Sequence, residues 1–193
     1  IRDGTITVNG SPYTATRAEA RAHAIRYLPE EPLRNACAPR MSVAENLAFR
    51  MFDIDQNGRP VFWKDSRAIA DNATALIDGF QVKTSSANAP IASLSGGNVQ
   101  RAVLGRELTG DVKALIVSNP CFGLDFAAVS AIRDRLIEAR NQGTAILLIS
   151  EDLDEIMELS DRILVMSEGR IAFETPIATA DVAQIGQHMA GHG

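Results

Sequence analysis

One octapeptide in the middle of the chain combines residue types that can bind phosphate groups. Residues 94–101 have the sequence Leu-Ser-Gly-Gly-Asn-Val-Gln-Arg, where a polar loop leads into a helix predicted over residues 98–108. Two glycines let the backbone approach a ligand closely, and a helix N-terminus offers N–H groups with partial positive charge. Ser95 adds a hydroxyl donor. Gly96 and Gly97 alone would also suit an ordinary turn before a helix, but the complete octapeptide favours a phosphate-binding surface.

Short apolar runs predict the sheet that positions this octapeptide. Residues 114–117 and 145–149 are nearly all apolar, and a helix is predicted between them over residues 127–141. Apolar runs of this length joined by helices are typical of a parallel sheet with both faces covered. We therefore predict an α/β core.

A helical insertion interrupts the predicted core. Ser42 and Glu45 have the spacing of a capping box, which predicts that a helix begins at Val43. The chain is divided into a core over residues 1–30 and 94–175, an insertion over residues 31–93, and a C-terminal tail or helix over residues 176–193.

The composition excludes several classes of protein. The 193 residues are 46% hydrophobic and 22% charged, as in an ordinary globular protein, and the net charge of −5 argues against a nucleic-acid partner. Cys37 and Cys121 form no CxxC pair, which favours a reducing cytoplasm. The three histidines have no metal-ligand spacing. The apolar runs are too short to cross a bilayer, so we expect any membrane connection to run through a partner.

Together with its surroundings, the octapeptide resembles the LSGGQ-type signature of ABC-transporter ATP-binding subunits, in the Asn-containing variant of bacterial sugar and nucleoside importers. Residues 27–30 (Tyr-Leu-Pro-Glu) resemble the Q-loop region, and residues 41–47 resemble the start of the helical subdomain. Residues 123–125 (Gly-Leu-Asp) resemble the D-loop, and residues 148–169 resemble the switch strand and closing hairpin. In order along the chain, these segments are similar to the second cassette of a tandem ATPase.

The resemblance implies a P-loop NTPase-like fold and a function in ATP-driven import of simple sugars or nucleosides. It implies ATP with Mg²⁺ at a composite site shared with a second cassette. It also implies that the helical insertion contacts the transmembrane permease, so that the protein is cytoplasmic and peripheral on the inner face of the plasma membrane. The residues that it implies for nucleotide binding are Ser95, Gly96, Gly97, Asn98, Gln100, Glu30 and Asp125.

The sequence departs from the family pattern at the phosphate loop. No G-x-x-x-x-G-K-[ST] motif occurs, so we expect the chain to begin downstream of this loop, as a piece or as a truncated gene product. The resemblance implies that the missing strand lies between residues 145–149 and residues 162–166. Without it, we expect an altered sheet in which these two strands pair, or a chain that associates with another.

Two further departures affect the predicted chemistry. Ser118 and Asn119 stand where the family has Asp-Glu, so neither metal-facing charge nor a general base is supplied there. Glu151 stands at the position of the switch histidine, where it would repel a phosphate or simply begin a helix. We expect a cassette that is inactive alone, degenerate at its own site, and able to donate its signature loop in trans. The alternative is a non-catalytic interaction module that takes no part in transport.

Overall fold

The computed structural model describes residues 4–51 and 66–190, which divide into two compact units between Leu147 and Leu148. The first unit holds most of the sheet and the predicted insertion, and the second holds a helix, a hairpin and the C-terminal helix.

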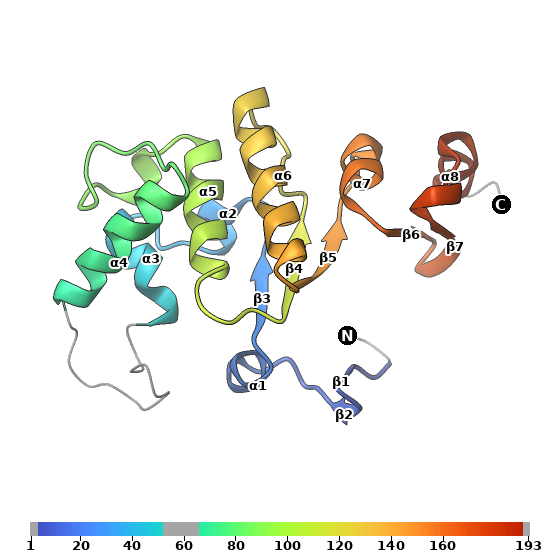
Figure 1. Ribbon diagram of the computed structural model, residues 1–193, viewed down its shortest axis with the longest axis horizontal. Helices are drawn as coiled ribbons and strands as arrows, with labels where there is room; N and C mark the ends of the chain where they lie inside the picture. Colours follow the sequence, from blue (N-terminus) through green and yellow to red (C-terminus); the bar gives the residue numbers. More distant parts are fainter. Residues whose placement is uncertain (1–3, 52–65, 191–193) are drawn as a thin grey trace. The chain divides into compact units, whose positions relative to one another are not determined.

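The core sheet has three strands, β3 (Ile25–Leu28), β4 (Ala114–Ser118) and β5 (Ala145–Ile149), in the order β3-β4-β5 (Figure 1). Strands β3 and β4 run parallel, with Leu28 opposite Val117. The predicted α/β fold with a parallel sheet is therefore confirmed. A small antiparallel hairpin of β1 (Thr7–Val8) and β2 (Ser11–Pro12) precedes it.

One face of the sheet is covered. Leu28 and Val117 are fully buried, whereas Tyr27, which lies in register with Ile116, is 48% exposed. Because side chains alternate between the two faces of a strand, Leu28 and Val117 point to the covered face and Tyr27 to the open one.

Helix α5 (Gly96–Glu107) is the central helix of the first unit. It contacts β3 and helix α6 (Phe126–Asn141), beside which it lies in Figure 1. Val99, Val103 and Leu104 of α5 are buried, as are Ile132 and Leu136 of α6. Helix α5 also contacts the helices that lie between β3 and β4. It therefore joins the predicted insertion to the sheet.

Between β3 and β4 the regular elements of the described residues are helices, which are joined by turns and loops. Helix α1 (Arg17–Ala22) precedes β3. The elements that follow β3 are α2 (Pro32–Asn35), α3 (Val43–Leu47), η1 (Ala48–Arg50), α4 (Ser66–Gly79) and η2 (Ile91–Ser93). The predicted capping box of α3 is confirmed, because Glu45 N donates to Ser42 Oγ and Ser42 N donates to Glu45 Oε2.

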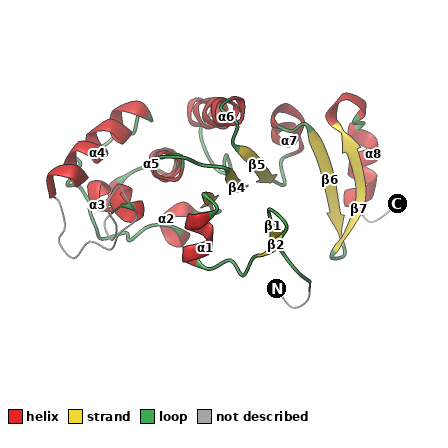
Figure 2. Cartoon of the chain, turned by 60° about the horizontal axis from the view of Figure 1, so that its bottom comes forward, coloured by secondary structure: helices red, strands yellow, loops and turns green. Residues whose placement is uncertain are grey.

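The second unit is built around an antiparallel hairpin. Its elements in chain order are α7 (Leu153–Leu159), β6 (Arg162–Ser167), β7 (Arg170–Pro176), η3 (Ile177–Thr179) and α8 (Val182–Met189). Ile163 and Val165 of β6 and Ile185 of α8 form its buried core. Figure 2 shows the long strands β6 and β7 side by side with α8 next to them.

The expected pairing of residues 145–149 with residues 162–166 stays a prediction, and each of these strands has another partner in the structure. Strand β5 belongs to the sheet of β3 and β4, and β6 bonds to β7 along its whole length, from Arg162 opposite Pro176 to Ser167 opposite Arg170. The tight turn at Glu168 and Gly169 favours this local hairpin, because a two-residue connection costs little chain entropy to close. Self-association of the chain stays a prediction.

Candidate functional site

The signature loop, residues 94–101, stands at the N-terminus of α5. The helix begins at Gly96, two residues earlier than predicted, and Ser95 is its N-cap residue with extended backbone. Asn98 N and Val99 N donate to Ser95 O, whereas the N–H groups of Gly96 and Gly97 have no backbone acceptor among the described residues. Ser95 and Gly96 are exposed. The loop therefore presents backbone donors and a hydroxyl at the surface.

The Ser95 hydroxyl does not cap its own helix. No helix N–H donates to Ser95 Oγ, which instead accepts a hydrogen bond from Asn98 Nδ2 at 2.8 Å. Asn98 Oδ1 accepts from the backbone N–H of Lys83 at 2.7 Å. The Asn98 side chain therefore connects the signature serine to the loop that follows α4.

The two glycines are packed against the start of α6. A Cβ atom on Gly97 would lie 3.0 Å from Ala128 Cβ, and one on Gly96 would lie 3.8 Å from Leu124 Cδ2. Asp125 is the N-cap of α6, and its Oδ1 accepts from Ala128 N at 2.9 Å. The structure therefore brings the signature loop and the predicted D-loop together.

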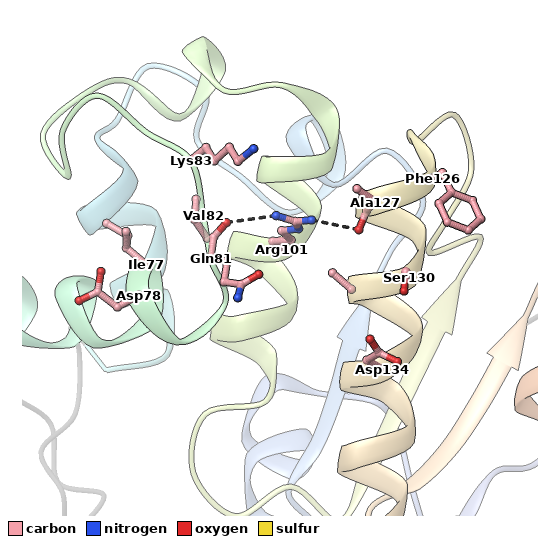
Figure 3. A pocket seen from close by; sticks show the side chains of 11 residues that line it. Ile77, Asp78, Gln81, Val82, Lys83, Arg101, Phe126, Ala127, Ser130 and Asp134 are labelled. Carbon is pink, nitrogen blue, oxygen red and sulfur yellow. Dashed lines mark hydrogen bonds between the residues drawn. The ribbon is translucent and has the colours of Figure 1, made fainter.

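Arg101 of α5 connects the loop that follows α4 to the start of α6, and this connection is called the Arg101 brace. Its Nη1 donates to Gln81 O and its Nη2 to Ala127 O, both at 3.2 Å (Figure 3). It lies in an open cleft of about 790 Å³ between the end of α4, α5 and α6. The residues that line this cleft are Ile77, Asp78, Gln81, Val82, Lys83, Arg101, Phe126, Ala127, Ser130, Ala131 and Asp134. These contacts of Arg101 could not be predicted from residue types, because both acceptors are backbone atoms distant in the chain.

Gln100, which the sequence places among the ligand-binding residues, points into the protein. Its side chain is 4% exposed, and its Nε2 has no hydrogen-bond partner in the part of the chain that the structure describes. It lies one turn before the buried Leu104 on the same helix face. Its predicted contact with a nucleotide would require the side chain to leave this packing.

Glu30, Ser118 and Asn119 lie at the carboxyl ends of neighbouring parallel strands. Ser118 ends β4, and Glu30 follows the end of β3 by two residues. This edge of an open parallel sheet is where α/β proteins place their ligands. Glu30 is exposed, and Ser118 and Asn119 are half-buried. Asn119 has φ 43°, a left-handed conformation that asparagine tolerates better than most residues.

Glu151 lies in the second unit, in the exposed turn before α7. Its neighbour Asp152 caps that helix, accepting from Asp154 N at 3.0 Å and Glu155 N at 3.3 Å. Ser150 Oγ donates to the buried Glu155 Oε2 at 2.6 Å. This acidic stretch therefore serves a helix start, and a role for Glu151 toward phosphate stays a prediction.

The other end of α5 carries a buried charge network that sequence reasoning missed. Glu107 is fully buried and bonds to Arg106 Nε at 2.8 Å and to Arg50 Nε at 2.9 Å. Arg106 Nη1 donates to Ala36 O at 2.9 Å and to Asn46 O at 3.2 Å. The network ties α5 to the insertion through residues far apart in the chain.

Cys37 and Phe49 lie beside this charge network. Burial raises the pKa of the Cys37 thiol to about 11, and nearby Arg106 opposes this shift only in part. The Arg106 guanidinium lies 5.3 Å from the centre of the Phe49 ring. Phe49, Phe52 and Phe62 are candidates for the permease groove, with an ordinary core role expected for at least two of them, and Phe49 is half-buried in this contact. Phe52 and Phe62 lie outside the described residues.

The described residues form neither a membrane-spanning helix nor a recognisable metal cage. Within residues 4–51 and 66–190, no helix has the length and apolar character needed to cross a bilayer. Over the same residues, no three His, Cys, Asp or Glu side chains come together in a way that could hold a metal ion.

Comparison with known proteins places these features in a family. Residues 2–121 match the family model described as ABC transporter. The chain is 37% identical to the glucose import ATP-binding protein TsgD13 of Haloferax volcanii, over 100% of this chain and 36% of that protein. It is 34% identical to the nucleoside import ATP-binding protein NupA of Lactococcus lactis, over 99% of this chain and 38% of that protein. The chain thus spans little more than a third of the length of these relatives.

Solved structures of ATP-binding cassettes and transporter subunits have a similar fold. The ATP-binding cassette MJ0796, in a dimeric post-hydrolysis state bound to ADP and Pi, superposes with a TM-score of 0.73 at 15% identity, over 91% of this chain and 74% of that one. CbiO1 from Clostridium perfringens superposes with a TM-score of 0.68 at 20% identity, over 97% of this chain and 70% of that one. At these identities the likeness concerns the fold alone.

Proposed function

Because the chain belongs to the ABC transporter family, we propose that it is part of an ATP-binding subunit that energises the import of simple sugars or nucleosides. The names of its relatives, which import glucose or nucleosides, support this class of solute. The observation that carries the proposal is the turn of the exposed Ser95 and Gly96 and the half-buried Gly97 at the N-terminus of the 12-residue helix α5. Backbone N–H groups, a hydroxyl and the helix dipole there suit a polyphosphate.

In this proposal the signature loop acts in trans. The loop contacts the γ-phosphate of an ATP that a partner cassette holds, and Mg²⁺ belongs to that composite site. Gly97 permits the approach because the position has no side chain in the way. Asp125 shapes the adjoining turn by capping α6. The nucleotide roles of Glu30, Asn98, Gln100 and Asp125 belong to this proposal.

The cassette's own site is proposed to be catalytically degenerate. Ser118 and Asn119 are neutral, so they offer neither a carboxylate for Mg²⁺ nor a base for the attacking water. A positioned general base contributes about 10²–10⁴-fold to a rate. We therefore expect ATP turnover at the composite site that uses this chain's signature loop, and background turnover at the other.

The helical insertion, residues 31–93, is proposed to carry the permease contact. Its link to α5 through Arg50 and Glu107 would transmit a displacement of the insertion to the signature loop. The residues 1–30 and 94–175 form the ATPase core in this division, and residues 176–193 form an appended helix. The protein would then sit on the cytoplasmic face of the membrane through its permease.

The proposal is tested on the complete gene product assembled with its permease. We expect Gly97→Asp to abolish ATP turnover, because the side chain meets Ala128 and places a negative charge at the phosphate surface. Gly79→Asp is the matched control, since a Cβ atom there meets nothing within 4 Å. Ser95→Ala, which adds no atoms, guards against a folding defect. Full turnover in both Ser95→Ala and Gly97→Asp would contradict the proposal and favour the non-catalytic interaction module.

A further inference from the structure

We propose that Asn98 is a positioning residue that holds the Ser95 hydroxyl with its proton directed outward, toward the phosphate, and that the backbone of Lys83 sets the orientation of Asn98. The inference rests on the proposed function and deepens it. The role is based on two hydrogen bonds, from Lys83 N to Asn98 Oδ1 and from Asn98 Nδ2 to Ser95 Oγ.

The direction of the first hydrogen bond is fixed by chemistry. A backbone N–H can only donate, so the Asn98 atom that lies 2.7 Å from Lys83 N must be the amide oxygen. The amide nitrogen then faces Ser95 Oγ at 2.8 Å, and an amide nitrogen can only donate. Lys83 therefore determines which end of the Asn98 amide reaches Ser95.

The second hydrogen bond decides what Ser95 can offer a ligand. A hydroxyl has one proton and two acceptor sites, and the Asn98 amide occupies one of the acceptor sites. The proton is not used for Asn98, and Ser95 Oγ accepts no helix N–H either. It is left to donate into the exposed space in front of the loop. A phosphoryl oxygen, which only accepts, fits this donor.

The anchor at Lys83 is held in place by its neighbours. Val82 is buried and its N–H donates to Ile77 O at 2.9 Å. Arg101 Nη1 binds Gln81 O at 3.2 Å while Nη2 of the same guanidinium binds Ala127 O. The loop at residues 81–83 is therefore fixed to both α5 and α6. A chain of hydrogen bonds that all point one way also polarises each member, which strengthens the outward donor.

The substitution Asn98→Asp tests whether Asn98 directs the Ser95 proton or only holds the loop in place. The introduced carboxylate still accepts from Lys83 N, and the Ser95 hydroxyl can still bond to it, so the loop keeps both of its contacts. The Ser95 proton, however, must now turn inward, because a carboxylate only accepts. We expect an unchanged thermal midpoint but a fall of about tenfold or more in ATP turnover, since a hydrogen bond to a charged group is lost. The added carboxylate also repels phosphate, and the loss that Asn98→Asp still causes in a Ser95→Ala background measures this second effect.

The effect should appear in kcat rather than in KM. The partner cassette holds ATP in the proposed composite site, and Ser95 meets the γ-phosphate only when the two cassettes close. We therefore expect the KM for ATP to stay within about twofold of the parent value. A large rise in KM with unchanged kcat would overturn the inference, because it would place Asn98 in ground-state binding.

The decisive measurement is a double-mutant cycle on the complete ATPase assembled with its permease, with Ser95→Ala, Asn98→Ala and both together. Asn98→Ala should lower kcat by roughly three- to tenfold, because the freed hydroxyl samples other rotamers. In the Ser95→Ala background it should change kcat by less than about twofold. Asn141→Ala, an exposed asparagine on α6, is the control and should change nothing.

The outcomes separate the two levels of the proposal. Normal turnover in both Ser95→Ala and Gly97→Asp would overturn the proposed function itself, whereas normal turnover in Ser95→Ala with a loss in Gly97→Asp would overturn only the positioning role. A fall in Ser95→Ala with normal turnover in Asn98→Asp would overturn only the positioning role. Equal losses from Asn98→Ala in both backgrounds would also overturn it, since Asn98 would then act independently of Ser95.

Discussion

Helix α5 ends in two different ways. At its N-terminus Ser95 and Gly96 are exposed, and no side chain caps the helix. At its C-terminus Arg106 and Glu107 are buried, and their charges are neutralised by each other and by Arg50. Both ends carry strong polar groups, but only the C-terminal end satisfies them within the protein. The comparison shows that α5 is anchored at its C-terminal end, whereas its N-terminal end has polar groups available to a ligand.

The largest effect is expected from removing the charge at the centre of the anchored end. Glu107→Ala should lower the free energy of unfolding by about 3–5 kcal/mol, because it leaves two guanidinium groups without their counter-charge. Chemical unfolding monitored by circular dichroism measures the loss. Glu138→Ala removes a partner of Arg135 in an exposed pair and should cost no more than about 1 kcal/mol. Similar losses in the two variants would mean that the buried network does not anchor the helix.

The next effect concerns the reactivity of Cys37, which lies beside this anchored end. With a pKa of about 11, the thiol stays protonated at pH 8, and the fraction in the reactive thiolate form rises only as the pH approaches 11. At pH 8 we expect iodoacetamide to modify it roughly a hundredfold more slowly than an unperturbed thiol. A Cys121→Ser background isolates the signal, with a short cysteine peptide as the reference. Labelling at the peptide's rate would show that the anchored end is open to solvent.

A smaller effect is expected in the middle of the helix. A Cβ atom on Gly105 would lie 2.8 Å from the Phe80 ring, which is itself covered by the Arg135 guanidinium at 4.9 Å. Gly105→Ala should therefore lower the free energy of unfolding by about 1–3 kcal/mol, although alanine favours a helix more than glycine does. Gly186→Ala in α8 meets nothing within 4 Å and should be neutral or stabilising. Thermal unfolding of both variants tests the sign of the difference.

The smallest effect sharpens the comparison at the exposed end. Asp125→Ala removes a side chain that caps α6 and should cost about 1 kcal/mol of stability. Ser95→Ala should cost less than about 0.5 kcal/mol, because Ser95 makes no such cap bond to α5. A loss in Ser95→Ala as large as that in Asp125→Ala would mean that the serine serves the helix.

Local signals in the sequence predicted much of the fold. The strand at residues 145–149 and the capping box of α3 depend on neighbouring residues, so they could be recognised. The start of α5 was placed two residues late, because glycine disfavours helices and the tertiary contact of Gly97 with Ala128 outweighs that preference. The hairpin of β6 and β7 could be recognised because the turn at Glu168 and Gly169 is local.

The candidate site was predictable only in part. The motif identified Ser95, Gly96 and Gly97, but the brace of Arg101 and the bond from Lys83 N to Asn98 use backbone atoms, which leave no trace in residue types. The burial of Gln100 could have been anticipated, since Leu104 stands one turn later on the same face of α5. Arg50 and Glu107 are 57 positions apart, so their pairing depends on the fold.

The close approach of Gly97 to Ala128 has a mechanical consequence. A Cβ atom on Gly97 would lie only 3.0 Å from Ala128 Cβ, so the starts of α5 and α6 pack more closely than a side chain at position 97 would allow. We therefore expect the signature loop and residues 123–125 to move together. Arg101 connects them to the loop at the end of α4, because it donates to both Gln81 O and Ala127 O. A displacement of the end of α4 would then move both loops together and would not move one relative to the other.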